Sequence, residues 1–264
     1  MLAGPKGQIA PGVTDAFMAR LAQDCGYAVA HLSGNAIHKN FCLPDRNLLD
    51  AAQIAARVAE ISAAADIPLI VDAGPICVET AALARTVALY EEAGASALRF
   101  EDCLKNEYGA DVRELAIAPK ELVVERIKAA VATRRDDTLV LIARCDSRPL
   151  ESLARVRERL SAYVEADADA VGVQLEDVTE FAAVAAVPLV TLWPRDKVSA
   201  FEFFRLGVKI ALMPSSLPLA AAASMRELLL ELKETGTERQ YFARQREFAA
   251  AEKWYKRLGS DKSR

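Results

Sequence analysis

Residues 139–174, LVLIARCDSRPLESLARVRERLSAYVEADADAVGVQ, contain one complete strand–helix–strand unit. The unit opens with an apolar run at 139–144, which is typical of a strand that is buried on both faces. Apolar residues then recur at three- and four-residue spacings over 150–165, which predicts an amphipathic helix, and 170–174 is a second apolar run. Two strands joined by a helix predict a parallel pair with a crossover connection.

The same alternation of short apolar runs and longer amphipathic stretches continues along the chain. The other expected strands are at 8–13, 28–33, 69–73, 97–101, 189–192 and 209–213. The other expected helices are at 15–24, 51–64, 79–92, 119–133, 178–184 and 199–205. Eight such units predict an α/β fold of the (β/α)8 barrel type. An open doubly wound sheet is less favoured, because the first turn, GVTD at 12–15, lacks the G-x-G-x-x-G pattern usual in such sheets.

Two further helical patterns, at 217–234 and 238–258, follow the eighth strand, so the chain has one helix more than the barrel needs. The last pattern contains the aromatic residues Tyr241, Phe242, Phe248, Trp254 and Tyr255. Such a helix either covers the bottom of the barrel or packs on another subunit, and we favour the second. We therefore expect one barrel domain over 1–264, with 237–258 as an additional C-terminal helix that packs on a neighbouring subunit of a homo-oligomer, either a dimer or a tetramer.

Composition narrows the class of protein. The 264 residues carry a formal net charge of −4, and no block of like charge suggests a nucleic-acid partner. The five cysteines are odd in number and form no C-x-x-C pair, which argues against a disulfide framework and against a zinc site. No apolar run approaches the roughly 20 residues of a membrane span. We expect a cytoplasmic protein that binds neither nucleic acid nor membrane.

Polar residues at the ends of the expected strands are the candidates for an active site, because barrels of this type build it at the carboxyl ends of the strands. They are Asp15, Ser33, Gly34, Asn35, Asp72, Glu101, Asp102, Arg144, Asp146 and Gln174. Asp72 and Glu101 follow apolar runs on adjacent strands, and two carboxylates so placed need a cation or a shared proton. Mg²⁺ is the simplest cation.

Arg144 ends a strongly apolar strand, and an anionic ligand such as a carboxylate or phosphoryl group would satisfy its guanidinium. Together with Asp72 and Glu101 it can equally form a structural ion-pair network at the barrel rim. The residues alone leave both interpretations open.

The order of these residues resembles the isocitrate lyase and phosphoenolpyruvate mutase superfamily over nearly the whole chain. PGVTDA at 11–16 is similar to its P-G-x-x-D-A, PLIVDA at 68–73 to the start of its P-x-x-x-D-A-D-T-G-x-G, and FED at 100–102 to its I-E-D. IARCDSR at 142–148 is similar to its I-A-R-T-D-A-R. Three further matches are SG at 33–34, LPD at 43–45 and YVEADADA at 163–170. Seven matches in the same order make the resemblance specific.

The resemblance implies a TIM-barrel enzyme in which Mg²⁺, or Mn²⁺ in its place, stabilises the enolate of a small 2-oxo acid. The positions that carry over are Asp72 and Glu101 for the metal, Asp45 in support of them, and Ser33, Gly34, Asn35 and Arg144 for a substrate anion. Arg144 and Asp45 would then act in catalysis.

The chain departs from the family pattern at two places that bear on chemistry. Gly74 stands where the family has the second Asp of D-A-D, so we expect Mg²⁺ to bind weakly until a substrate completes its coordination. The K-x-C-G-H loop of the lyases is replaced by CLKNEYGA at 103–110, which leaves Tyr108, Glu107 or a water as the catalytic acid.

The pocket also differs. His31 and Gln174 stand where many lyases have Tyr and Glu, and we expect both to contact the substrate. The favoured function is a Mg-assisted carbon–carbon lyase or decarboxylase acting on a small 2-oxo acid or a substituted malate through an enolate. A carbon–phosphorus enzyme of the phosphoenolpyruvate mutase or phosphonopyruvate hydrolase type is the alternative. A barrel with altered metal dependence and a non-catalytic binding protein also remain open, because of Gly74.

Overall fold

The structure, a computed structural model, describes residues 2, 4, 6–44, 48–75, 78–104, 116–173, 178–182, 186–193 and 197–258. The chain divides into two compact units, Met1–Pro218 and Leu219–Arg264. The first unit contains the barrel and the second contains the C-terminal helices. The single barrel domain expected over 1–264, with 237–258 as an additional helix, stays a prediction.

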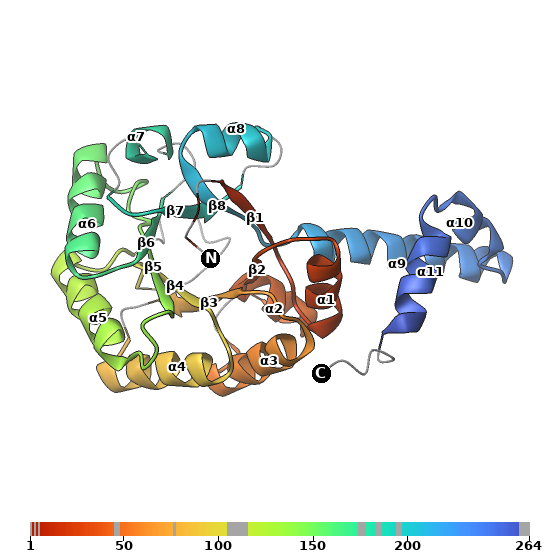
Figure 1. The fold of residues 1–264 in the computed structure, drawn as a ribbon, viewed down its shortest axis with the longest axis horizontal. Coiled ribbons are helices and arrows are strands. Elements are labelled where there is room, and N and C mark those ends of the chain that lie inside the picture. The colour runs from red at the N-terminus through yellow and green to blue at the C-terminus, as the bar shows by residue number, and fades with distance from the viewer. Residues whose placement is uncertain are drawn as a thin grey trace. The chain divides into compact units, whose positions relative to one another are not determined.

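Eight parallel strands form the centre of the first unit, inside a ring of helices (Figure 1). They are β1 (Gln8–Pro11), β2 (Ala30–Leu32), β3 (Leu69–Pro75), β4 (Ala97–Glu101), β5 (Val140–Arg144), β6 (Ala170–Gly172), β7 (Leu189–Leu192) and β8 (Val208–Met213). From β2 to β8 each strand pairs with the next one, and β1 pairs with β8. A parallel bridge between Gly12 and His31 joins β1 to β2, where the Val13 N–H donates to the His31 carbonyl at 2.9 Å. The predicted (β/α)8 TIM barrel is confirmed.

Helices alternate with the strands as the sequence predicts. They are α1 (Ala16–Asp24), α3 (Ala51–Ala64), α4 (Thr80–Glu92), α5 (Lys120–Thr133), α6 (Leu153–Glu165), α7 (Val178–Ala182) and α8 (Ala200–Arg205). Several begin after a side-chain cap, which satisfies backbone N–H groups that the first turn leaves unpaired. Asp15 caps α1, and Asp50 with Gln53 and Ser199 with Glu202 form capping boxes at α3 and α8.

One helix was not expected. α2 (Gly34–Asn40) follows β2 directly and has only seven residues, too few to show a helical period in the sequence. His38 on α2 is buried, with Nδ1 2.7 Å from the Gly34 carbonyl and Nε2 accepting the backbone N–H groups of Leu48 and Leu49 at 3.1 and 3.3 Å. His38 therefore has a structural role, as an ordinary polar residue of this region.

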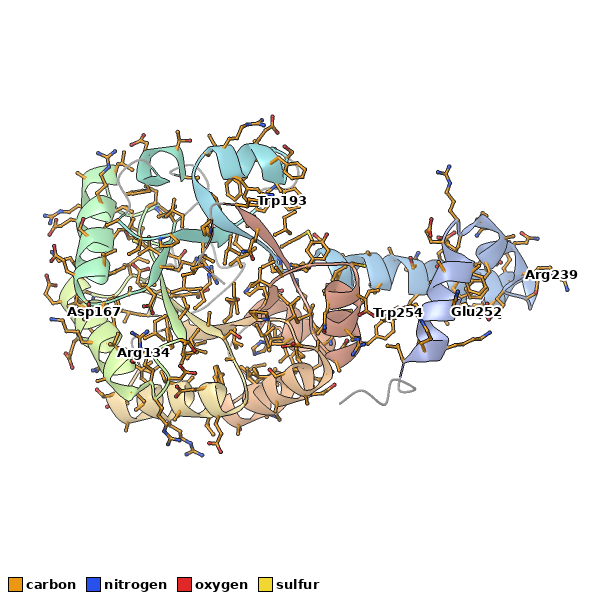
Figure 2. All side chains as sticks on the ribbon, in the orientation of Figure 1. Arg134, Asp167, Trp193, Arg239, Glu252 and Trp254 are labelled. Atoms are coloured by element: carbon orange, nitrogen blue, oxygen red, sulfur yellow. The ribbon has the colours of Figure 1, made fainter. Side chains whose placement is uncertain are left out.

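Two layers of side chains fill the inside of the barrel, whose interior is shown in Figure 2. The apolar layer consists of Ala10, Val29, Ile70, Ala97, Ile142, Ala170, Val190, Ile210 and Leu212. Because residues two apart on a strand point to the same face, the next inward positions toward the carboxyl ends follow directly. These positions hold His31, Asp72, Arg99 and Arg144, and Glu101 follows two residues after Arg99. We call these five residues the charged layer. Charges at such a depth are stable only when they are paired, and these are.

The second unit contains most of α9 (Ser216–Thr235), and then α10 (Arg239–Arg244) and α11 (Phe248–Arg257). The single helix expected at 238–258 is wrong, because the backbone becomes extended at Gln245 (φ −84°, ψ 108°). The break lets the rings of Phe242 and Phe248 come together, with centroids 4.1 Å apart. Among the described helices, none is both long and apolar enough to span a membrane.

Candidate active site

Asp72 lies at the centre of the charged layer, on β3. Its Oδ1 is 2.8 Å from Arg99 Nη1 and 3.0 Å from His31 Nε2, and its Oδ2 accepts the Gly34 N–H at 3.2 Å. Burial alone would raise the pKa of Asp72, but the charges of His31 and Arg99 outweigh burial and hold that pKa well below its usual range. Asp72 is therefore an ionised carboxylate whose charge its own neighbours already balance.

Glu101, at the end of β4, is the second buried carboxylate. Arg144 Nη1 lies 2.6 Å from its Oε1, and the Cys103 thiol donates to its Oε2 at 3.6 Å. Arg144 also reaches across to Asp146, with 2.7 Å between Nε and Oδ1. Burial raises the pKa of Glu101, and the nearby carboxylate of Asp146 acts in the same direction, while Arg144 opposes both. Arg144 thus joins two carboxylates of its own chain.

Asp102 organises the loops behind this pair. Its carboxylate accepts the Asp146 backbone N–H and the Tyr163 hydroxyl, each at 2.8 Å. Tyr163 OH lies 3.4 Å from Nη1 of Arg159, whose guanidinium also binds both oxygens of Glu151. These contacts tie the end of β4 to the segment after β5, and so fix where Asp146 meets Arg144.

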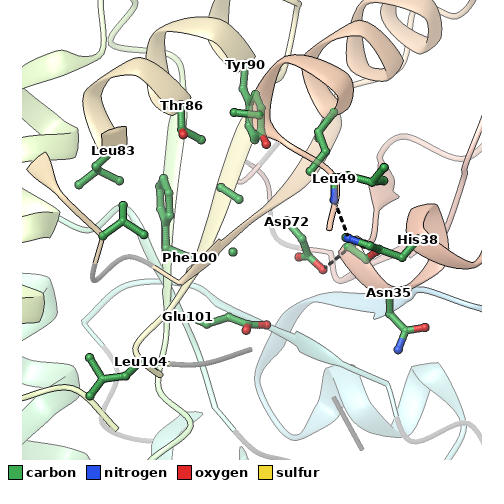
Figure 3. Close-up of a pocket in the computed structure, with 16 residues that line it drawn as sticks. Asn35, His38, Leu49, Asp72, Leu83, Thr86, Tyr90, Phe100, Glu101 and Leu104 are labelled. Carbon is green, nitrogen blue, oxygen red and sulfur yellow. Dashed lines mark hydrogen bonds between the residues drawn. The ribbon is translucent and has the colours of Figure 1, made fainter. Parts of the chain in front are cut away.

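A cavity of about 310 Å³ opens beside the charged layer (Figure 3). Its polar lining includes Gly34, Asn35, His38, Asp72, Thr86 and Glu101, and its apolar lining includes Leu49, Ile54, Leu83, Tyr90 and Phe100. A larger cavity, of about 410 Å³, lies along α6 and contains none of the residues that end β2 to β5. Because residues at the carboxyl ends of the strands line only the first of these two cavities, we take it as the substrate site.

Comparison with known proteins identifies the family. A model of the phosphoenolpyruvate phosphomutase family matches residues 2–233. The chain belongs to this family.

Curated relatives and solved structures agree with the assignment. A 2-methylisocitrate lyase of Aeropyrum pernix is 31% identical over 239 residues, covering 88% of this chain and 77% of the relative. A 2,3-dimethylmalate lyase of Eubacterium barkeri is 30% identical and covers 90% and 85%. The crystal structure of a 2,3-dimethylmalate lyase, described as a PEP mutase/isocitrate lyase superfamily member, matches with a TM-score of 0.81 and 26% identity. The match covers 93% of this chain and 85% of that one. The predicted superfamily is confirmed, and these curated relatives are carbon–carbon lyases, as predicted.

A phosphoenolpyruvate phosphomutase from Streptomyces platensis subsp. rosaceus shows the same fold with a TM-score of 0.86 and 20% identity, covering 98% of this chain and 96% of that one. A phosphonopyruvate hydrolase, solved with oxalate and Mg²⁺, has a TM-score of 0.81 and 24% identity, covering 98% and 94%. At these identities the likeness concerns the fold.

The structure gathers several of the predicted family residues around the cavity. Gly34, Asn35, Asp72 and Glu101 line it, and Ser33 precedes α2 as its N-cap without a side-chain capping bond. The predicted residues Asp45, Glu107, Tyr108 and Gln174 lie outside the described residues.

Two of the predicted residues are placed differently from what we expected. His31, expected to contact substrate, is fully buried and holds Asp72 from behind. The Gly34 N–H, expected to bind a substrate anion, donates to Asp72.

The metal site predicted at Asp72 and Glu101 does not fit the described residues. Arg99 Nη1 lies between them, 2.8 Å from Asp72 Oδ1 and 3.9 Å from Glu101 Oε1. Among the described residues, the group whose ligand atoms converge is instead Glu101, Cys103 and Asp146. A thiol is a poor ligand for Mg²⁺, which prefers oxygen atoms in octahedral geometry, and burial raises the pKa of Cys103 far above its usual range.

The predictions from the sequence do not include Arg99, Cys103 or Tyr163 as site residues. Arg99 had a detectable signal, because it stands two residues before Glu101 on a strand and must share its face. Tyr163 begins the match at 163–170, but nothing in its spacing indicates Asp102 as its partner, because the contact joins residues 61 positions apart in the chain.

Proposed function

We propose that this protein is a carbon–carbon lyase that acts on a small 2-oxo acid or a substituted malate through an enolate. The observation that carries the proposal is the cavity itself, in which two carboxylates on neighbouring strands face a helix start at Gly34 and Asn35. The lyase activities of the curated relatives, each covered over more than two thirds of its length, support the same reaction class.

The described residues supply binding and charge. Cleavage beside a hydroxyl- or oxo-bearing carbon leaves an electron pair that becomes an enolate, whose oxygen needs nearby positive charge or hydrogen-bond donors. Arg144 binds Glu101, which lines the cavity, and a substrate carboxylate would share Arg144 with Glu101 and Asp146. Burial raises the pKa of Glu101, so this carboxylate takes up a proton more readily than an exposed one, and a proton there would weaken its hold on Arg144.

The acid and base that move the substrate protons are proposed at Tyr108 and Glu107, outside the described residues. Mg²⁺ or Mn²⁺ belongs to the proposal only as a prediction from the family, and because Asp72 and Glu101 do not fit it, no step above depends on a metal. We also propose a cytoplasmic location. The four described cysteines, Cys25, Cys42, Cys103 and Cys145, are free, in agreement with this.

A substrate screen tests the function. Decarboxylation of oxaloacetate, carbon–carbon cleavage of 2-methylisocitrate or 2,3-dimethylmalate, and hydrolysis of phosphonopyruvate each yield pyruvate. One pyruvate assay with and without Mg²⁺ therefore covers these four reactions. We expect release from one of the first three. Release from phosphonopyruvate alone, with an equal amount of phosphate, would contradict the proposal and establish the carbon–phosphorus alternative.

A further inference from the structure

We propose that Arg99 takes the place of a divalent cation between Asp72 and Glu101, so that this barrel carries out its chemistry without Mg²⁺. The statement about chemistry rests on the proposed function, whereas the statement about the site does not. The proposal follows from the position of Arg99, from the contacts of Asp72 and from the charge of the whole layer.

Arg99 lies deep in the barrel, only 2% exposed. On β4 it follows Ala97 and precedes Glu101 at two-residue spacing, so all three point inward. The parallel register places Arg99 directly beside Asp72 on β3 and Glu101 directly beside Arg144 on β5. The guanidinium is thus held next to one carboxylate and within 3.9 Å of the other by the strands themselves.

Asp72 has little capacity left for a metal. A carboxylate oxygen offers about two acceptor sites, and Oδ1 already has two partners, Arg99 Nη1 at 2.8 Å and His31 Nε2 at 3.0 Å. Oδ2 accepts the Gly34 N–H at 3.2 Å. A metal at Oδ1 would have to displace a guanidinium that is nearly fully buried.

The charge of the layer leads to the same conclusion. Asp72 and Glu101 of the charged layer and the adjacent Asp146 bring three negative charges when ionised. Arg99 and Arg144 bring two positive charges, so these five groups sum to −1 before His31 is counted. Gly74 stands where the family pattern has a further acid, and glycine has no side chain to bind a metal. A divalent cation entering here would meet two guanidinium groups and little uncompensated negative charge.

Metal titration of the purified full-length protein tests the proposal without any substrate. Mg²⁺ and, separately, Mn²⁺ are titrated calorimetrically into chelator-treated wild type, Arg99→Gln and Arg99→Lys. We expect no saturable binding by wild type or by Arg99→Lys, which keeps a cation in place. Arg99→Gln should bind the metal saturably, with an affinity at least about tenfold above the weakest that the titration detects, because the competing charge is gone.

Arg134→Gln is the matched control. Arg134 is also an ion-paired arginine of low exposure, with Nη1 2.6 Å from Asp169 Oδ2, but it lies just after α5, near the amino end of β5 (Figure 2). Its variant should bind metal no better than wild type. Thermal melting checks that each variant is folded. If Arg99→Gln does not fold, wild type still decides, since saturable binding of Mg²⁺ by wild type overturns the proposal.

Measurements of activity with and without metal distinguish this proposal from the proposed function. With any substrate that releases pyruvate, the wild-type rate in excess chelator should equal the rate in Mg²⁺ within about twofold, because the proposal gives Mg²⁺ no part in the reaction. Loss of the rate in chelator and its recovery with Mg²⁺ would overturn the role of Arg99. If no substrate is cleaved under either condition, the proposed function fails, while the titration still judges Arg99.

Discussion

Arg144 is the residue on which the proposed site depends most, because it joins Glu101 and Asp146 across the ends of two strands. A lysine keeps the charge but has no planar fork, so Arg144→Lys cannot keep both contacts. We expect kcat/KM for pyruvate release to fall about tenfold, or ~1.4 kcal/mol. Steady-state kinetics measure this effect. Arg155→Lys, at an exposed ion pair with Glu158, should behave as wild type, and unaltered kinetics in Arg144→Lys would leave Arg144 a purely structural role.

Tyr163 matters through a single buried hydrogen bond. Tyr163→Phe removes the hydroxyl that donates to Asp102 at 2.8 Å and leaves a buried carboxylate oxygen without that donor. We expect a loss of about 1–3 kcal/mol in the free energy of unfolding. Urea unfolding measures it, with the exposed Tyr27→Phe as the control. An unchanged midpoint would show that another donor replaces the hydroxyl.

The sequence predicts which residues form the site better than it predicts which of them pair with one another. Asp72, Glu101 and Arg144 were recognised because each ends an apolar strand, and the structure brings them together in the charged layer. Their partners depend on strand register, which sets Arg99 beside Asp72 and Arg144 beside Glu101. Register between strands more than 25 residues apart is not written in local spacing, so the structural network and the metal site could not be distinguished.

At the scale of elements, the strands were predicted closely because continuous apolar runs mark strands buried on both faces. β4 and β7 have the predicted ends, and the other strands differ by a few residues. α2 is too short to show a helical period in the sequence. The break between α10 and α11 is not visible either, because the apolar residues of 238–258 keep helical spacing across it. The contact between Phe242 and Phe248 that accompanies the break is tertiary.

The strands also carry the stability of the barrel. Ile142 on β5 is fully buried in the apolar layer beneath Arg144, where no side chain can easily move to fill a gap. Ile142→Ala should therefore lower the free energy of unfolding by about 2–5 kcal/mol. Urea unfolding tests this, with Phe201→Ala, at a side chain that is 74% exposed, expected to change little. A loss as small as that of the control would mean that the apolar layer is loosely packed.

At the scale of the whole molecule, the C-terminal unit supports the prediction of an oligomer. α9 has no buried residue, and Leu219, Met225, Leu229 and Leu230 on it are all exposed. An apolar helix surface of this kind is typical of subunit contacts, so we propose that this unit packs on a second copy of the chain. Light scattering should show a dimer or tetramer, and removal of residues 219–264, which include this apolar surface, should shift it toward the monomer. A monodisperse monomer for the full chain would contradict this proposal.

The central claim is that a carbon–carbon bond is cleaved at the charged layer. The most direct measurement compares pyruvate release by wild type and by Glu101→Gln from the best substrate of the screen. The amide keeps the size of Glu101 but removes its charge beside Arg144 and its capacity to hold a proton. We predict that wild type releases pyruvate and that Glu101→Gln lowers kcat at least about 100-fold, while thermal melting shows that the variant is still folded at the assay temperature. Equal rates in the two proteins would show that the chemistry takes place elsewhere.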